Sequence, residues 1–203
     1  MVAATLIMGT TLFETRALAI SDDVPEWKGA AASMAVGPVT TQPIGHYGFC
    51  KKRPDECRAS KKRTPPPLTA TRWTTINEVN ALVNKAVAPR TDDEMHGIAE
   101  LWSYPEAEGD CEDYVLLKRK MLMERGFSPS DLLITVVRKP DGEGHAVLTV
   151  RTERGDYVLD NLSRHVRHWR ETPYRFLKRQ ASHHAGRWVD ITDGPATLVG
   201  SVK

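Results

Sequence analysis

A capped amphipathic helix with a cysteine in its first turn is the feature that most restricts the fold of this chain. Asp110 is a good N-cap, and Asp113 lies three residues later, where it can satisfy a second free amide. Gly126 stands where a C′ glycine would end the helix. The residues with helical apolar spacing between them are Val115, Leu116, Leu117, Leu122 and Met123. Cys111 is therefore expected at the positive end of the helix dipole, which favours its thiolate.

Two predicted strands downstream supply a candidate base and a candidate group to orient it. Residues 144–150 and 156–161 have strand patterns and are separated by a polar turn, so they should pair as an antiparallel hairpin. His145 opens the first strand and Asp160 closes the second, which places them near the same end of the ladder. Packing the Cys111 helix on this hairpin would create a Cys–His–Asp constellation, the arrangement that activates a cysteine nucleophile.

Each of these three residues also has a structural interpretation. Free cysteines are often buried structural residues, but core positions rarely lie between an aspartate and a glutamate, as Cys111 does. His145 taken alone could be a satisfied core histidine, and Asp160 taken alone is weaker evidence still. The order of the three residues and the hairpin geometry together favour a catalytic triad. The other histidines lack such neighbours and are expected at the surface: His46, His96, His165, His168, His183 and His184.

The remaining pattern predicts helices first and a sheet afterwards, which indicates an α+β fold. Residues 75–78 form a capping-box sequence, followed by an apolar helical stripe that ends before Pro89. Residues 91–109 are expected to form a shorter helix and a loop that packs Trp102 and Tyr104 near the nucleophile. Residues 132–137 read as a buried strand and 174–178 as a further strand of an antiparallel sheet.

The first nineteen residues are predicted to be a signal peptide. Residues 2–13 are apolar but too short for a permanent membrane anchor, and Ala17-Leu18-Ala19 offers a small-x-small cleavage site. Cleavage would export residues 20–203, with no stable membrane insertion after processing. The alternative, a buried N-terminal helix, lacks a cap.

Residues 20–72 are expected to be mainly loops in an exported segment. Cys50 and Cys57 lie close together there, so in an oxidising compartment they are expected to form a disulfide and leave Cys111 free. A zinc site formed by His46, Cys50 and Cys57 is the alternative, although a fourth ligand is missing.

Several motifs in combination resemble the bacterial transglutaminase-like cysteine peptidases. The main ones are GDCEDY at 109–114, GHAVLTV at 144–150 and YVLDN at 157–161, and the resemblance covers roughly 42–190. Further matches are residues 45–50, Pro54, Cys57, Trp73, Ile76, Asn77, Val79, Asn80, Trp102, residues 173–176, Arg179, Gln180 and Trp188.

The resemblance implies a papain/transglutaminase-like core at 73–203, with N-terminal helices packed on an antiparallel sheet, and a triad of Cys111, His145 and Asp160. Similar proteins clip a large surface adhesin, and some are held inactive by an inner-membrane receptor that senses a cyclic dinucleotide. A periplasmic or secreted location, a protein substrate such as an adhesin, and such a receptor as partner are therefore implied.

The carboxylates beside the cysteine raise an electrostatic conflict. Asp110, Glu112 and Asp113 place negative charge around a thiol that must ionise, and like charge raises a cysteine pKa. A hard cation such as calcium, with carboxylate oxygens as ligands, would compensate. The resemblance also implies calcium, bound at the acidic residues flanking the nucleophile, here Asp110 and Glu112. The alternative is capping together with a salt bridge to Lys118 or Arg119.

The sequence leaves part of the oxyanion hole open. The backbone amide of Cys111 is the natural first donor to an oxyanion, and Gln42 and Trp102 are candidates for the second.

The nearly balanced charge, 28 Lys and Arg against 26 Asp and Glu, argues against a dedicated nucleic-acid binder. The expected function is an exported, calcium-dependent cysteine endopeptidase. The alternatives are another acyl transfer on the same triad (transglutaminase, deamidase or amidase) and a non-catalytic binding module.

Overall fold

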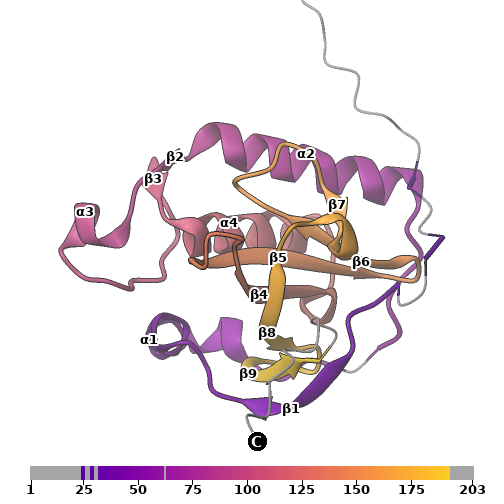
Figure 1. Ribbon diagram of the computed structural model, residues 1–203, viewed down its shortest axis with the longest axis horizontal. Helices are drawn as coiled ribbons and strands as arrows, with labels where there is room; N and C mark the ends of the chain where they lie inside the picture. The colour runs from indigo at the N-terminus through magenta and orange to yellow at the C-terminus, as the bar shows by residue number, and fades with distance from the viewer. Residues whose placement is uncertain (1–23, 26–27, 30–31, 62, 193–203) are drawn as a thin grey trace, which may run out of the picture.

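A seven-stranded antiparallel sheet runs through the molecule and combines strands from both ends of the chain (Figure 1). The computed structural model describes residues 24–25, 28–29, 32–61 and 63–192, so the predicted signal peptide lies outside the described residues. The strand order is β1-β9-β8-β4-β5-β6-β7. The strands are β1 (Val36–Thr40), β4 (Leu132–Arg138), β5 (Gly144–Thr152), β6 (Gly155–Leu159), β7 (Arg167–His168), β8 (Arg175–Ala181) and β9 (His184–Ile191).

Helix α4 lies between the sheet and helix α2, and it contacts β5 on one side and α2 on the other (Figure 1). The helices are α1 (Ile44–Lys52), α2 (Ala70–Ala86), α3 (Asp92–His96) and α4 (Cys111–Glu124), with 3-10 turns η1 (Pro54–Cys57), η2 (Pro129–Asp131) and η3 (Trp169–Glu171). A short parallel pair, β2 (Ala88–Pro89) and β3 (Glu108–Gly109), precedes α4. This arrangement confirms the predicted α+β fold of helices packed on an antiparallel sheet.

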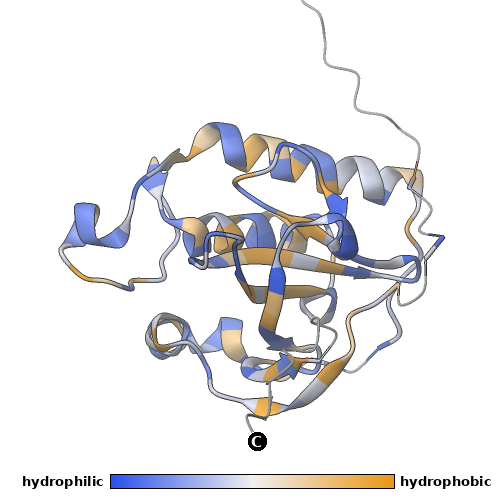
Figure 2. Cartoon of the chain, in the orientation of Figure 1, coloured by the Kyte–Doolittle hydropathy of each residue, from blue (hydrophilic) through white to orange (hydrophobic). Residues whose placement is uncertain are grey.

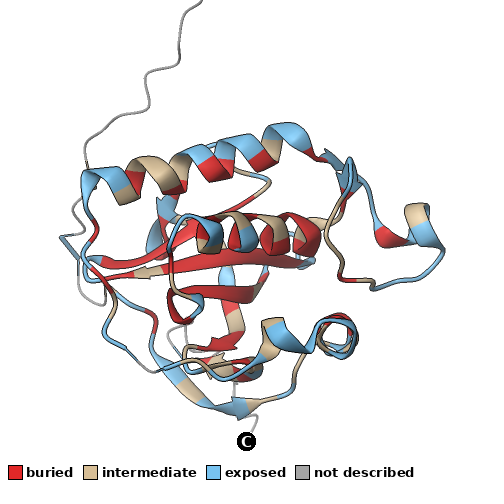
Figure 3. Ribbon diagram, turned by 180° about the vertical axis from the view of Figure 1, so that it is seen from behind, coloured by how far each residue is buried: buried red, intermediate tan, exposed pale blue. Residues whose placement is uncertain are grey.

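Strand β5 is buried on both faces, which explains its continuous apolar sequence. Leu148 and Val150 join the core beneath α2 and α4, whereas Val147 belongs to a second core cluster with Val158 and Trp169. Successive side chains of a strand point to opposite faces, so one run of residues supplies both cores. Figure 3 shows the buried residues concentrated on α4 and the central strands, and Figure 2 shows apolar and polar residues alternating along α2. None of the helices formed by the described residues is both long and apolar enough to cross a bilayer.

Helix α2 begins earlier than its capping-box sequence predicted. The observed N-cap is Thr69, whose side chain accepts a hydrogen bond from the amide of Arg72 at 3.3 Å. Thr75, expected at the helix start, is inside the helix, and its hydroxyl donates to the carbonyl of Thr71 at 2.8 Å. A threonine in a helix can bond the carbonyl four residues back, so the sequence signal alone does not fix the cap.

The segment expected to be mainly loops contains β1, α1 and η1. Helix α1 has almost no amphipathic pattern, because Gly45 and His46 occupy its buried positions together with Phe49. A side chain at Gly45 would lie 2.3 Å from Cδ1 of Trp102, so close packing requires glycine there. Strand β9, also not predicted, pairs with β1 at the sheet edge.

Two histidines expected at the surface are buried. His46 is 1% exposed, and its Nδ1 accepts a hydrogen bond from Nε1 of Trp188 at 3.2 Å. Burial lowers the pKa of His46 to about 3, so the ring is neutral. His168 is 2% exposed and lies 2.8 Å from the carbonyl oxygen of Ala32 through Nε2. Both rings contribute to packing of the N-terminal part of the chain, which the sequence pattern does not reveal.

Candidate active site

Cys111 is the first residue of α4, as the capping pattern predicts. Asp110 is the N-cap, and its side chain accepts from the backbone amide of Cys111 at 2.7 Å. Asp113 completes the capping box by accepting from the amide of Asp110 at 3.3 Å. The residue before the N-cap, Gly109, must be small, because a Cβ there would lie 2.9 Å from Cβ of Asp113. The local sequence therefore fixes where the helix presents its thiol.

His145 and Asp160 come together through the register of the β5–β6 hairpin. Leu148 pairs with Leu159, so Asp160 lies one residue beyond the last ladder pair, on the side of His145. Nε2 of His145 is 2.8 Å from Oδ1 of Asp160, and both side chains are buried. Since a carboxylate can only accept, Nε2 carries the proton of a neutral ring and Nδ1 keeps its lone pair.

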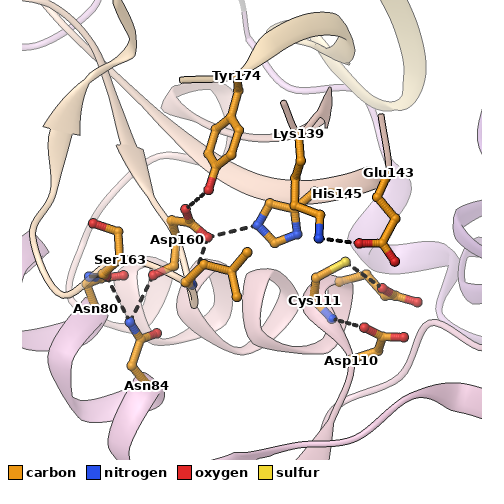
Figure 4. A network of polar contacts seen from close by, with 12 residues as sticks. Asn80, Asn84, Asp110, Cys111, Lys139, Glu143, His145, Asp160, Ser163 and Tyr174 are labelled. Atoms are coloured by element: carbon orange, nitrogen blue, oxygen red, sulfur yellow. Dashed lines mark hydrogen bonds and ion pairs between the residues drawn. The ribbon is translucent and has the colours of Figure 1, made fainter. Parts of the chain in front are cut away.

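The imidazole lies between Asp160 and Cys111, as Figure 4 shows. Its Nε2 is turned to Asp160, and the opposite side of the ring faces the thiol. Cys111 and His145 also line the same two hollows of the surface. The arrangement brings together a thiol, a ring nitrogen able to take its proton, and a carboxylate that orients the ring.

Tyr174, placed by the sequence only on an expected strand, is part of this constellation. Its hydroxyl donates to Oδ2 of Asp160 at 2.5 Å, and the amide of Leu162 donates to Oδ1 at 2.9 Å. Burial acts to raise the pKa of Asp160, but hydrogen bonds from His145, Tyr174 and Leu162 outweigh it and the pKa lies below its usual value. Asp160 therefore stays ionised and keeps the imidazole in place.

The thiol of Cys111 is held in its protonated form by its neighbours. Sγ donates to Oε2 of Glu112 at 3.2 Å. Burial raises the pKa of Cys111 well above its ordinary value, and the charges of Glu112 and Asp110 raise it further, against a hydrogen bond from the backbone of Ala146 that lowers it. The sequence suggested that the helix dipole would favour the thiolate, whereas burial and the neighbouring carboxylates act in the opposite direction.

The carboxylates around the thiol are themselves perturbed. Burial raises the pKa of Glu112 to about 8, with the charges of Asp110 and Glu100 adding to the rise. Burial also raises the pKa of Asp113 to about 7. Burial is the largest cause in both cases, so the protein keeps these buried acids partly protonated near neutral pH.

The alternative to metal binding for these acidic residues was capping together with a salt bridge to Lys118 or Arg119, and the described residues show only the first of these. Capping is present, because Asp110 and Asp113 form the capping box. No ion pair joins Asp110 or Glu112 to a basic side chain within the described part of the chain. Lys118 is fully buried with no hydrogen-bond partner for Nζ, and Nε of Arg119 donates to the carbonyl of Leu132 at 3.1 Å.

Among the residues that the structure describes, two groups of ligand atoms are close enough to hold a metal ion. Asp110, Cys111 and Glu112 form one, with ligand atoms within 4.8 Å of one another. His46, Cys50 and Cys57 form the other, but the two cysteines are joined in a disulfide with Cα atoms 5.6 Å apart. The disulfide leaves no thiolate for the alternative zinc site, and Cys111 is the free cysteine among the described residues.

The expected oxyanion donors are all engaged. The Cys111 amide bonds Asp110, and Nε1 of Trp102 donates to Oε2 of Glu100 at 3.0 Å. Nε2 of Gln42 lies 2.7 Å from Nδ1 of His46. Trp102 lines a hollow together with Cys111, whereas Gln42 is not among the residues of that hollow.

An open groove passes over the thiol and the imidazole. One hollow, of about 270 Å³, is lined by Arg90, Glu94, Lys139, Asn161 and Leu162 in addition to Cys111 and His145. The other, of about 580 Å³, is lined by Ile44, Glu100, Trp102, Val136 and Lys178 in addition to the same two residues. Because the reactive groups lie where the two hollows meet, an extended chain could pass on both sides of them.

Comparison with known proteins identifies the family of the chain. Residues 36–196 match the family described as bacterial transglutaminase-like cysteine proteinase. A structure of calcium-bound LapG from Legionella pneumophila has a TM-score of 0.49 and 22% identity, covering 62% of this chain and 72% of LapG. EGTA-treated LapG from the same organism has a TM-score of 0.49 and 20% identity, covering 63% of this chain and 73% of LapG. No curated protein matches the chain in sequence. Since the family match covers most of its length, the chain belongs to the bacterial transglutaminase-like cysteine proteinases.

Proposed function

We propose that this chain is an exported, calcium-dependent cysteine endopeptidase with Cys111 as nucleophile, His145 as base and Asp160 as the group that orients the base. The observation that carries the proposal is the imidazole of His145, bonded to Asp160 through Nε2 at 2.8 Å and facing the thiol at the start of α4 with its other side (Figure 4). This is the order of groups that nucleophilic cysteine catalysis requires.

The tautomer of His145, with its proton on Nε2, leaves Nδ1 as the nitrogen that accepts a proton. Nδ1 of His145 takes the proton of the thiol, and the sulfur attacks the peptide carbonyl. The same nitrogen returns the proton to the leaving amine, which departs and leaves an acyl group on Cys111. Water, activated by His145 in turn, hydrolyses that thioester. Asp160 stabilises the imidazolium that forms between these steps.

The acidic residues at the helix start fit a calcium ion. Asp110 and Glu112 offer carboxylate oxygens, the ligand type that calcium prefers, and their ligand atoms lie within 4.8 Å of one another. Burial and the charge of Asp110 raise the pKa of Glu112 to about 8, as expected for a carboxylate that lacks a positive partner. Bound calcium would supply positive charge that favours the thiolate. Glu112 accepts a hydrogen bond from the thiol, and Asp110 accepts one from the Cys111 amide, the natural oxyanion donor.

The family resemblance supports the cellular setting of the proposal. Export follows from the predicted signal peptide at 1–19, and the mature chain would act in the periplasm or outside the cell. The substrate would be a surface or secreted protein such as a large adhesin, and an inner-membrane cyclic-dinucleotide receptor would regulate cleavage. The groove that is open on both sides of Cys111 suits cleavage within a chain.

Mass spectrometry of exported proteins tests reaction and substrate together. Strains that express the wild type or Cys111→Ala are compared, with equal amounts of the two proteins confirmed in the exported fraction. New N-termini present only with the wild type would identify the substrate and cleavage site, and the protein's own N-terminus should be Ile20. Crosslinked or deamidated glutamines in place of new N-termini would refute the peptidase assignment in favour of another acyl transfer.

A further inference from the structure

The residue that orients the base lies outside the sheet that brings it to the site. The β5–β6 ladder ends at the pair of Leu148 and Leu159, so Asp160 begins a segment, 160–164, that belongs to neither helix nor strand. Strand pairing therefore does not fix the backbone of Asp160. Buried carbonyl groups in such a segment need donors from elsewhere in the fold.

Two asparagines of α2 supply those donors. Nδ2 of Asn84 donates to the carbonyl of Asp160 at 2.9 Å and to that of Ser163 at 3.2 Å. Nδ2 of Asn80 donates to the carbonyls of Ser163 at 3.2 Å and Arg164 at 3.4 Å. The two side chains are one helical turn apart, on the same face of α2, and Figure 4 shows both beside this segment.

The burial of Asn80 indicates more than a surface contact. Asn80 is 0% exposed, and the Oδ1 atoms of both Asn80 and Asn84 are buried without a hydrogen-bond partner. Leaving a buried amide oxygen unbonded is costly. Both asparagines nevertheless direct their amide nitrogens at the carbonyls of the segment, which gives its backbone the contacts that a longer strand would have given.

We propose that Asn84 is a positioning residue for catalysis, which holds the backbone of Asp160 and through it the imidazole of His145, while Asn80 holds the following carbonyls of Ser163 and Arg164. The proposal rests on the proposed function, in which His145 is the base. Asp160 is then fixed from two directions. Asn84 holds its main chain, while Tyr174 and the amide of Leu162 hold its carboxylate. Removing the main-chain contact frees the segment to move away from α2 and weakens the bond between Asp160 and His145.

The test compares Asn84→Ala with Asn77→Ala. Asn77 is a matched control on the same helix, because its amide donates only to the carbonyl of Trp73, one turn back, at 2.9 Å. Asn84→Asp, which keeps the shape but replaces the donor, serves if the alanine variant does not fold. The primary readout needs no substrate: the rate of Cys111 alkylation by iodoacetamide is measured against pH, with the melting temperature measured in parallel.

We expect Asn84→Ala to lower the alkylation rate, in the same direction as Asp160→Asn, because an imidazole that is less well held takes the proton of the thiol less readily. Asn77→Ala should follow the wild type. With a protein substrate, kcat of Asn84→Ala should fall by up to about 100-fold, the scale for a displacement of about 1 Å at a catalytic group. In an Asp160→Asn background, Asn84→Ala should add almost nothing, since the two act through one contact.

Two results would overturn the positioning role. One is a wild-type alkylation profile in a folded Asn84→Ala protein when Asp160→Asn does lower the rate. The other is full additivity of the two substitutions in kcat. Failure of the proposed function is distinguishable, because a wild type that cleaves no protein while Asn84→Ala still lowers the alkylation rate would leave the positioning role in place.

Discussion

Replacement of Glu112 by glutamine should lower the pKa of Cys111. Oε2 of Glu112 accepts a hydrogen bond from Sγ of Cys111 at 3.2 Å, and Glu112 is 5% exposed. The carboxylate therefore opposes ionisation of the thiol both by its charge and by this hydrogen bond. Glutamine keeps the size of the side chain and its helix propensity but removes the charge. The capping box formed by Asp110 and Asp113 is untouched, so the start of α4 should persist.

The size of the effect depends on the ionisation of Glu112 itself. A full charge at the 3.2 Å separation seen here, with an effective dielectric constant of about 20, would oppose the thiolate by about 5 kcal/mol, or about 4 pKa units. This is an upper bound, because the pKa of Glu112 is raised to about 8. At pH 7 only about a tenth of the molecules then carry the charge, and by pH 9 about nine tenths do. The opposition therefore grows over the range in which an ordinary cysteine ionises.

Alkylation of Cys111 by iodoacetamide, followed by mass spectrometry from pH 5 to 10 in EGTA, measures the change. Glu112→Gln should react at least about tenfold faster than the wild type near pH 8.5, and calcium should accelerate the wild type more than the variant. Glu106→Gln removes an exposed charge from the preceding segment and should follow the wild type. Coincident profiles for Glu112→Gln and the wild type in EGTA would refute the assigned contribution of Glu112 to the raised pKa of Cys111.

Three further substitutions test other parts of the structure. Asp160→Asn should preserve the fold but lower kcat by about 10⁴-fold through the wrong imidazole tautomer, and retention of more than about a tenth of the activity would exclude Asp160 as the orienting group. Cys50→Ala should lower the free energy of unfolding by about 2–3 kcal/mol, the scale for a short closed loop, and an unchanged urea midpoint would contradict this. Lys118→Met should stabilise the fold, because burial lowers the pKa of Lys118 from 10.5 to about 7. The stability of the wild type should therefore fall by up to about 5 kcal/mol as the pH drops from about 10.5 to 7, and urea titrations of Lys118→Met should lack this fall.

The placements that the sequence predicted and the structure shares are those with local signals. The capping residues of α4 lie within four positions of one another, and the short turn between β5 and β6 sets a hairpin register that brings His145 to Asp160. Cys111 could therefore be placed from a stretch of about twenty residues, and its partners from one hairpin.

The supporting residues have no such signal. Tyr174 reaches Asp160 from 14 residues further along, at the edge of a different strand. Asn84 reaches the same residue from 76 residues earlier, on a helix whose sequence pattern reports only its apolar stripe. A polar residue on the flank of a helix looks like a solvated surface position until the packing of α2 against the rest of the chain is known. In the same way, α1 is positioned by its close packing on Trp102, and β9 is positioned by its pairing with β1. Neither element has a periodic sequence pattern that predicts it.

Two requirements conflict at the start of α4: the acidic residues stabilise the helix that presents Cys111, but they also occupy the groups that catalysis needs. Asp110 is needed to cap the helix that presents Cys111, yet in this role it accepts the hydrogen bond of the very amide that an oxyanion would use. Glu112 likewise holds the proton that His145 has to take. If calcium binds both carboxylates, as proposed, it would compete with the thiol and the amide for these oxygens and would supply positive charge beside the sulfur. The acidic residues would then make the nucleophile dependent on the ion without changing the hairpin that holds its base.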